Sequence, residues 1–408
     1  MIRSTALLLL FAASATAQQN TDPPEKKEYA ALIKNLDSAD RDTRLDAINA
    51  IAELGPLVPK AVPALVGIVQ EKDEELRLNA ALALGKIGKE AVGPVGKLLA
   101  GTDVDNRYYA LSTLGWIGPE AKATAPQVLQ ALGDKNDGVR AKAALVLGRI
   151  GADPKIAIKP LLKMLADKNE AVRGAAGDAL GRFKASAAPA LGEALKDDSI
   201  PMRLEAAMAL GQIGPEAKAA IPALKFAALD RENDVAAESI RALVKIKDAA
   251  LPAMREILAD GDAKLRQRAL AGLVVSGKES APFLADALSS KLVDVRQEAS
   301  QAIVSLNLKE ESVIPALIQA MRDSDKDVRK HSMQALFRVA VGAREAIPNL
   351  LANLKDKDAD MRLLALNVIR EIPVESAAIV KAVTPLLRDA DERVQKVAKE
   401  VLAFQGKQ

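Results

Sequence analysis

Small and apolar residues recur along this chain in a regular pattern whose copies lie 30 or 33 positions apart. Counted from a residue that marks each copy and is arginine in ten of the twelve copies, they fall in most copies three, six, seven and ten positions later. Ala80, Ala83, Leu84 and Ile87 stand in this way after Arg77. The spacing places them on one face of a helix. The residues that mark the copies, called frame residues below, are Arg44, Arg77, Arg107, Arg140, Arg173, Arg203, Ala236, Arg266, Arg296, Arg329, Arg362 and Gln395.

Polar residues four positions before the frame residue predict where each of these helices begins. A short side chain with an oxygen can accept hydrogen bonds from the free N–H groups of a first helical turn. Only Glu232 and Leu292 depart from this pattern among the twelve copies. The residues expected to cap helices are Asp40, Asp73, Asp103, Asn136, Asn169, Ser199, Asp262, Asp325, Asp358 and Asp391.

A proline 13 or 14 positions before the frame residue predicts the start of a preceding helix, since proline suits a first helical turn. In several copies glycines close the second helix, as in Gly85-Lys86-Ile87-Gly88, and are typical of helix ends. The repeat is therefore a helix, an acidic turn, a second helix and a glycine turn. The prolines are Pro63, Pro94, Pro126, Pro160, Pro189, Pro222, Pro252, Pro282, Pro315 and Pro348.

The repeat resembles the short HEAT-like class found in phycobilisome lyases and other proteins. The stretches 75–95 and 138–151 carry the resemblance most closely. It implies an all-α fold, an α-α superhelix or HEAT-like solenoid of about twelve helix-turn-helix repeats of about 30–33 residues. We expect residues 29–408 to form one continuous array, because stacked neighbours bury the faces that a single pair leaves open.

The resemblance also implies a role for the frame arginine, as a ladder residue that pairs with acids in the turns of its own or the adjacent repeat. A buried charge needs such a partner. In the last repeat, Pro385 should kink or shorten the first helix. The candidate turn acids are Asp134, Asp167, Asp197, Asp260, Asp323 and Asp356.

The N-terminus predicts export. Arg3 precedes a short apolar stretch, and Ala15-Thr16-Ala17 is a cleavage signal of the A-x-A type. We expect residues 1–17 to be a signal peptide, residues 18–28 to be a flexible lead-in, and the mature chain to start at Gln18. The protein is then periplasmic or extracellular. The apolar stretch is too short to span a bilayer, and no later segment qualifies.

Composition argues against most catalytic chemistry. The chain has no cysteine and one histidine, His331, which excludes thiolate sites and metal centres built from several histidines. We expect His331 to be solvated. Two D-x-D-x-D turns, at residues 323–327 and 356–360, lack the glycine and glutamate of a calcium loop and should cap helices. We therefore expect a protein without a cofactor or metal that is not an enzyme. A lyase activity like that of phycobilisome lyases is a minor alternative, since no site residue carries over.

The face expected to bind a partner consists of positions one, five and nine after the frame residue, which point away from the buried stripe. In HEAT-like arrays the second helices line the concave face. In the first six copies these positions hold many large apolar residues, including the only tryptophan, and such clusters often mark interaction sites. We expect a protein-binding scaffold, in which Trp116 is either an exposed anchor or packs over its own repeat. The proposed partner-binding residues are Leu78, Leu82, Tyr108, Tyr109, Trp116 and Leu145.

Polyanion binding through the same second helices is the alternative to protein binding. A row of cations nine positions after the frame residue could follow a phosphate or sulfate backbone. The near balance of 57 Lys and Arg against 54 Asp and Glu weakens this, and nucleic acid is not expected. The partner should be another protein or peptide of unknown identity. The basic row comprises Lys86, Arg149, Arg182, Lys245 and Arg338.

Overall fold

The computed structural model describes residues 24–260, 262–338, 344–374 and 376–405, and these residues form helices joined by turns. The expected signal peptide and the cleavage point at Gln18 lie outside the described residues. The chain divides into two compact units, unit 1 at Met1–Gly151 and unit 2 at Ala152–Gln408. Each is described by itself below. The continuity of the array across both units stays a prediction.

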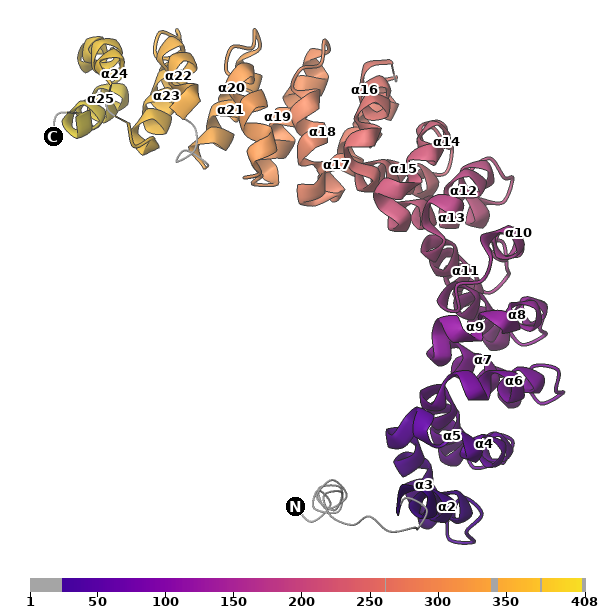
Figure 1. Cartoon of the computed structure of the whole chain (residues 1–408). Helices are drawn as coiled ribbons and strands as arrows, with labels where there is room; N and C mark the ends of the chain where they lie inside the picture. The colour runs from indigo at the N-terminus through magenta and orange to yellow at the C-terminus, as the bar shows by residue number, and fades with distance from the viewer. Residues whose placement is uncertain (1–23, 261, 339–343, 375, 406–408) are drawn as a thin grey trace. The chain divides into compact units, whose positions relative to one another are not determined.

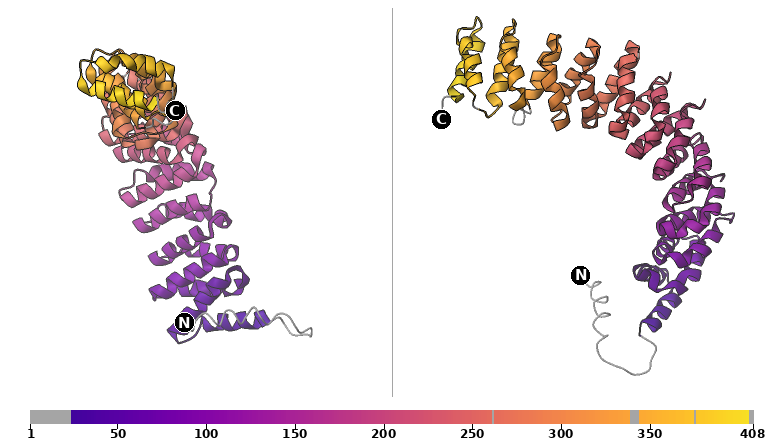
Figure 2. Two further views of the ribbon diagram at one scale, coloured as in Figure 1. Left: turned by 90° about the vertical axis from the view of Figure 1, so that its left-hand side faces the viewer. Right: turned by 45° about the horizontal axis from the view of Figure 1, so that its top comes forward.

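Unit 1 contains four helix pairs, which lie side by side in chain order (Figures 1 and 2). The second helices α5 and α7 pack against one another, as do α7 and α9. The described helices of this unit are α2 (Pro24–Asn35), α3 (Arg41–Leu54), α4 (Val62–Val69), α5 (Glu74–Ile87), α6 (Lys89–Leu98), α7 (Val104–Ile117), α8 (Ala125–Ala131) and α9 (Asp137–Arg149).

Unit 2 continues the same alternation with eight pairs, so the described residues hold twelve pairs and the predicted all-α repeat fold is confirmed. The described helices are α10 (Pro154–Met164), α11 (Glu170–Arg182), α12 (Ala188–Ala194), α13 (Ile200–Ile213), α14 (Ile221–Ala227), α15 (Asn233–Ile246), α16 (Leu251–Asp260), α17 (Ala263–Val275), α18 (Ala281–Ala287), α19 (Val293–Ser305), α20 (Ile314–Ala320), α21 (Lys326–Phe337), α22 (Ile347–Asn353), α23 (Ala359–Glu371), α24 (Ala377–Val383) and α25 (Glu392–Gln405).

The starts of the second helices follow the predicted caps. The Asp73 carboxylate accepts a hydrogen bond from the Leu76 N–H, and Ser199 caps α13 in the same way. The predicted exceptions, Glu232 and Leu292, make no capping hydrogen bond with their side chains. Several second helices end at a glycine with positive φ, such as Gly88 at 81° and Gly214 at 67°, a conformation that favours glycine.

The prolines mark most first helices, but two expectations were wrong. Pro63 occupies the first turn of α4, whereas Pro94 and Pro160 lie inside α6 and α10. In α10 the Asp153 side chain caps the helix ahead of the predicted start, so the helix begins before Pro160. The prediction for Pro385 is confirmed, because α24 ends at Val383 and a 3₁₀ turn at Thr384–Arg388 contains the proline.

The core contains the predicted apolar stripe together with apolar residues of the first helices, such as Leu65 and Leu161. Ala80, Leu84 and Ile87 of α5 are buried, as are Ala206 and Leu210 of α13. Small residues dominate the stripe, which lets neighbouring helices approach closely. Among the described residues at positions one, five and nine of the second helices, only Ser112 of α7 is buried.

Candidate functional site

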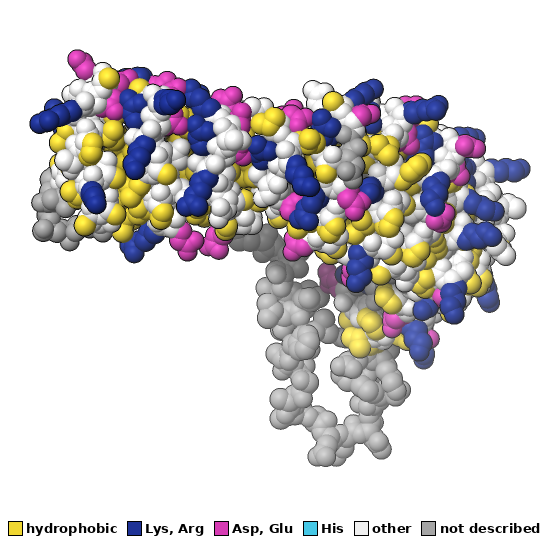
Figure 3. All heavy atoms as spheres, turned by 90° about the horizontal axis from the view of Figure 1, so that it is seen from above, with side chains coloured by type: hydrophobic (Ala, Val, Ile, Leu, Met, Phe, Trp, Pro, Cys, Tyr) yellow, Lys and Arg dark blue, Asp and Glu magenta, His cyan; other side chains and the backbone are white. Residues whose placement is uncertain are grey.

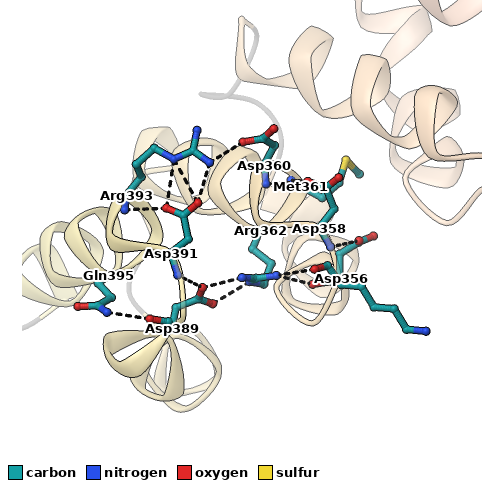
Figure 4. A network of polar contacts seen from close by, with 10 residues as sticks. Asp356, Asp358, Asp360, Met361, Arg362, Asp389, Asp391, Arg393 and Gln395 are labelled. Atoms are coloured by element: carbon teal, nitrogen blue, oxygen red, sulfur yellow. Dashed lines mark hydrogen bonds and ion pairs between the residues drawn. The ribbon is translucent and has the colours of Figure 1, made fainter.

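Frame arginines join consecutive repeats through their turns. In Arg107, Nη1 donates to the carbonyls of Gly101 and Thr102 in its own turn, at 3.1 and 2.9 Å. Its Nε lies 2.6 Å from the Asp134 carboxylate in the next turn. Figure 4 shows the same arrangement at Arg362, between the Asp356 carbonyl and the Asp389 carboxylate. The pairing of frame arginines with turn acids, which the family resemblance implied, is thus confirmed for Asp134, Asp323 and Asp356.

Repeat length decides which acid each arginine contacts. Where the next frame residue is 33 positions on, the described pairs join the arginine to an acid 27 positions on, as in Arg203 with Asp230 at 2.7 Å. Where the interval is 30, the partner changes. Arg77 contacts Asp103 and Asp105 instead.

Among the arginines followed by a 30-residue interval, Arg173 makes the longest described ion pair. It lies 3.9 Å from Glu205, and its buried Nε makes no hydrogen bond within the described structure. Asp197, an expected partner, uses its carboxylate to accept from the Ser199 N–H. The side chain of Asp260, another candidate, is outside the described residues.

Large apolar side chains are exposed on α5 and α7, within unit 1. The exposed fractions are 42% for Leu78, 38% for Leu82, 37% for Tyr108 and 42% for Trp116. Leu145 on α9 is half-buried. We call Leu78, Leu82, Tyr108 and Trp116 the apolar patch. Because α5 packs against α7 and α7 against α9, the predicted residues belong to three consecutive second helices.

Trp116 lies across the neighbouring repeat at a glycine. A Cβ atom on Gly85 would stand 3.1 Å from the Trp116 Cβ and 3.5 Å from Cε3. The absence of a side chain at Gly85 therefore makes room for the indole. Trp116 packs its Cβ and part of its ring against α5 of the preceding repeat, not over its own repeat, and 42% of the residue stays exposed.

The two tyrosines differ in their surroundings. Tyr109 is half-buried, with the Arg77 guanidinium 5.2 Å from its ring centroid, and burial raises its pKa. Tyr108 is more exposed, and its ring lies 4.7 Å from Lys142 Nζ. The rings meet edge to face at 6.0 Å. Tyr109 is therefore held between Tyr108 and Arg77 and is less exposed than Tyr108.

Sequence reasoning missed the part played by glycines eight positions after the frame residue. A Cβ on Gly115 would meet Val146 and Arg149, and one on Gly181 would meet Gln212. At Gly85, Gly115 and Gly181, residue nine of the following repeat thus lies over residue eight of the one before, whereas Gly211 faces Ala242. The recurrence of Gly85, Gly115, Gly181 and Gly211 at one position was the available signal.

The cations of the alternative basic row are all exposed, but some have partners in their own unit. Lys245 lies 2.6 Å from Glu279, and Arg338 donates to the Val304 carbonyl at 2.8 Å. On the face drawn in Figure 3, Lys and Arg side chains are interspersed with hydrophobic and acidic ones. Arg182 lies in unit 2 with these two. Lys86 and Arg149 lie in unit 1, on the second helices that precede and follow the helix of Trp116.

The expectation of a solvated His331 was wrong. The ring is half-buried, and its Nδ1 lies 3.1 Å from the Ser300 hydroxyl of α19. Burial lowers the pKa of the imidazole. The acids of the D-x-D-x-D turns pair or cap as predicted: Asp325 accepts from the Val328 N–H and Asp358 from the Met361 N–H. The described residues contain no cluster of His, Cys, Asp or Glu arranged to hold a metal ion.

No helix in the described parts of the chain combines the length and the apolar character needed to cross a bilayer. Comparison with curated proteins gives no match.

Among solved structures, an engineered protein is 22% identical, with 93% of this chain and 98% of that chain covered and a TM-score of 0.28. Kap95p studied with RanGDP is 15% identical, with 93% and 61% covered and a TM-score of 0.43. Kap121p bound to Ste12p is 13% identical, with 94% and 49% covered and a TM-score of 0.46. The chain thus spans less than two thirds of either Kap chain.

The family model for HEAT repeats matches residues 29–95, 92–167, 158–244, 189–274 and 281–370. These matches cover most of the chain and coincide with the helix pairs described above. The chain belongs to the HEAT-repeat family.

Proposed function

We propose that this protein is a non-catalytic scaffold that binds another protein or peptide through the second helices of unit 1. The exposed Trp116, beside Tyr108, Leu78 and Leu82 on packed helices, carries the proposal. Tryptophan and tyrosine bury large areas at low entropic cost and are enriched among the residues that dominate binding energies. Rigid helices hold the patch in place before a partner arrives, which lowers the cost of association.

The chemistry of the chain favours binding over catalysis. Its one histidine is tied to Ser300, and its frame arginines and turn acids are engaged in joining repeats. These charged groups are therefore committed to structure. The lyase alternative has no site residues behind it. The basic row of the polyanion alternative is divided between the two units, and its Lys245 is paired with Glu279.

The test is the effect of Trp116→Ala on peptide affinity. A phage-displayed library of short random peptides is selected against the full-length protein, and enriched peptides are measured by calorimetry. We expect Trp116→Ala to weaken binding by about 2 kcal/mol, roughly 30-fold, with the melting temperature nearly unchanged. Phe226→Ala is the matched control, since Phe226 is 64% exposed on α14 of unit 2.

Two outcomes contradict the proposal. If Trp116→Ala melts the protein and binding falls only in step with stability, the indole is structural. If selected peptides bind the Trp116→Ala protein with unchanged affinity, the binding surface lies elsewhere. Binding lost steeply with added salt, and unaffected by Trp116→Ala, would instead favour the polyanion alternative.

We also propose that the protein acts outside the cytoplasm. The Arg3 n-region, the short apolar stretch and the Ala15-Thr16-Ala17 signal support it. Partners are then expected among periplasmic or extracellular proteins.

A further inference from the structure

A small pocket opens beside Trp116, between α7 and α9 of unit 1. Trp116 and Leu145 form its apolar walls, Gly115 lies in its wall on α7, and Lys142 and Arg149 bring positive charge from α9. No carboxylate is among the described residues that line it. The pocket thus joins an aromatic ring, aliphatic surface and two cations at the edge of the apolar patch.

The two cations are held near the pocket by contacts with uncharged groups. Lys142 Nζ lies 4.7 Å from the centre of the Tyr108 ring. Arg149 crosses α7 at Gly115, where an added Cβ would stand 3.6 Å from its Cδ and 3.9 Å from Nη1. Lys245, by contrast, also stands nine positions after a frame residue and is paired with Glu279. The pocket therefore presents positive charge to an incoming ligand.

Size and charge together define the ligand group. The cavity volume is about 20 Å³, and a single water molecule already requires roughly 10–15 Å³. The enclosed space therefore takes only a small group, and the two cations favour one that carries negative charge. In a protein partner, the small anionic group is a carboxylate. Arginine pairs with carboxylates in a planar, two-bond geometry, and lysine adds a point charge.

The position of the pocket favours a side-chain carboxylate over a chain terminus. Terminal carboxylates are commonly captured by backbone N–H groups arranged as a nest. Here the walls come from the middle and last turns of α7 and α9, where backbone N–H groups bond within the helices. The adjoining patch on α5 and α7 accommodates apolar residues next to the acid in the same segment.

We infer that the pocket binds an aspartate or glutamate side chain of a partner segment whose neighbouring apolar side chains contact Leu78, Leu82 and Tyr108. This inference rests on the proposed function and specifies its ligand. Trp116 belongs to both parts of the site, because it contacts α5 at Gly85 and also forms a wall of the pocket with the cations.

The experiment uses the same type of peptide library, displayed both with and without a free C-terminus, on the full-length protein. We expect enriched peptides to carry Asp or Glu beside aromatic or aliphatic residues. The affinity of a selected peptide is measured by calorimetry and by the emission of Trp116, the sole tryptophan. Replacing the peptide acid by its amide should weaken binding at least about tenfold. Arg149→Gln and Lys142→Gln should each weaken it about fivefold or more, while Lys122→Gln, an exposed cation outside the pocket, should not.

Reversing the charge of Arg149 gives the most direct test of the inference. Arg149→Glu should reject the acidic peptide and bind a version with lysine in place of the acid more tightly than the wild-type protein does. Peptides that depend on Trp116 but show no preference for an acid overturn this inference and leave the proposed function standing. Binding that requires a free C-terminal carboxylate also overturns it. If no selected peptide depends on Trp116, the proposed function fails, and this inference with it.

Discussion

At the scale of single residues, the side chain of the frame arginine has two roles: it bonds to carbonyls of its own turn and pairs with a carboxylate of the next turn. The turn before each second helix leaves carbonyls without helical partners, and Nη1 donates to two of them, as Arg203 does to Asp197 and Asp198. The Nε and Nη2 atoms of Arg203 bind the Asp230 carboxylate of the next turn. Removing either partner leaves a half-buried charge, so the pair is worth more as an intact unit than as separate contacts.

Asp230→Asn tests this difference. Asp230 and Arg203 have side-chain exposures of 11% and 14%, so the lost ionic bond should lower the free energy of unfolding by about 1–3 kcal/mol. The matched control is Glu216→Gln. Glu216 pairs with Lys184 between repeats at 3.3 Å, but both side chains are well exposed, and such pairs contribute little. Chemical denaturation of both variants measures the effect. Equal losses in the two would show that burial of the pair is unimportant.

At the scale of helices, caps and prolines were readable because each acts through its own few residues. Asp40 and Asp262 cap the helices that they precede, as their spacing predicted. The early start of α10 was missed because Asp153-Pro154 is a second start signal ahead of Pro160. Half-burial of Tyr109, Leu145 and His331 depends on how neighbouring repeats pack, which helical spacing within one repeat does not encode.

Repeat length is the element-level property with the clearest consequence. Deleting residues 297–329 removes one full repeat, joins Arg296 to the sequence that follows Arg329, and places Asp356 27 positions after Arg296. The pairing of Arg296 with Asp323 is thereby replaced by an equivalent one. Because contacts in repeat arrays are largely between neighbours, we expect a folded protein with one pair fewer. Circular dichroism and thermal melting measure the result.

The control deletion removes residues 297–326 and places Asp356 three positions too far along. It shortens the array by nearly the same length and breaks the arginine–aspartate register at the junction. We expect a lower melting temperature than for the deletion of the full repeat. If both deletions melt alike, register at the turns does not govern stacking.

At the scale of the whole molecule, the proposed export would determine which partners the patch can meet. The mature protein should begin at Gln18, after cleavage that follows Ala17. Intact mass of the protein recovered from the exported fraction measures this. Ala15→Arg together with Ala17→Arg should block cleavage, because the site requires small residues. A mass that includes Met1 in the exported wild-type protein contradicts the signal-peptide prediction.

Stability at acidic pH is a whole-molecule property, because pairs of a frame arginine and a turn aspartate recur along the chain. The hydrogen bond from Arg107 holds the pKa of Asp134 below its ordinary value, and Arg362 does the same for Asp389. An unfolded aspartate has a pKa of about 3.9. Between that value and the lower folded pKa, the unfolded chain binds protons that the folded chain does not. Stability from these pairs is therefore complete above about pH 4 and is lost as the pH falls through the folded pKa values.

Melting temperatures measured from about pH 7 to about pH 2 should accordingly fall steeply below about pH 4. The lowered pKa of His331 acts earlier. Its unfolded pKa is about 6.5, so the unfolded chain binds this proton first, and stability falls slightly between about pH 6.5 and the folded pKa. His331→Gln should remove the upper step and leave the lower one. Replacing Asp134 and Asp389 by asparagine should lower the melting temperature at neutral pH. It should also make the fall in melting temperature below about pH 4 less steep, because the ionised carboxylates of these residues are the source of that stability. If those substitutions leave the fall in melting temperature below about pH 4 unchanged, the carboxylates responsible for it are not those paired with frame arginines.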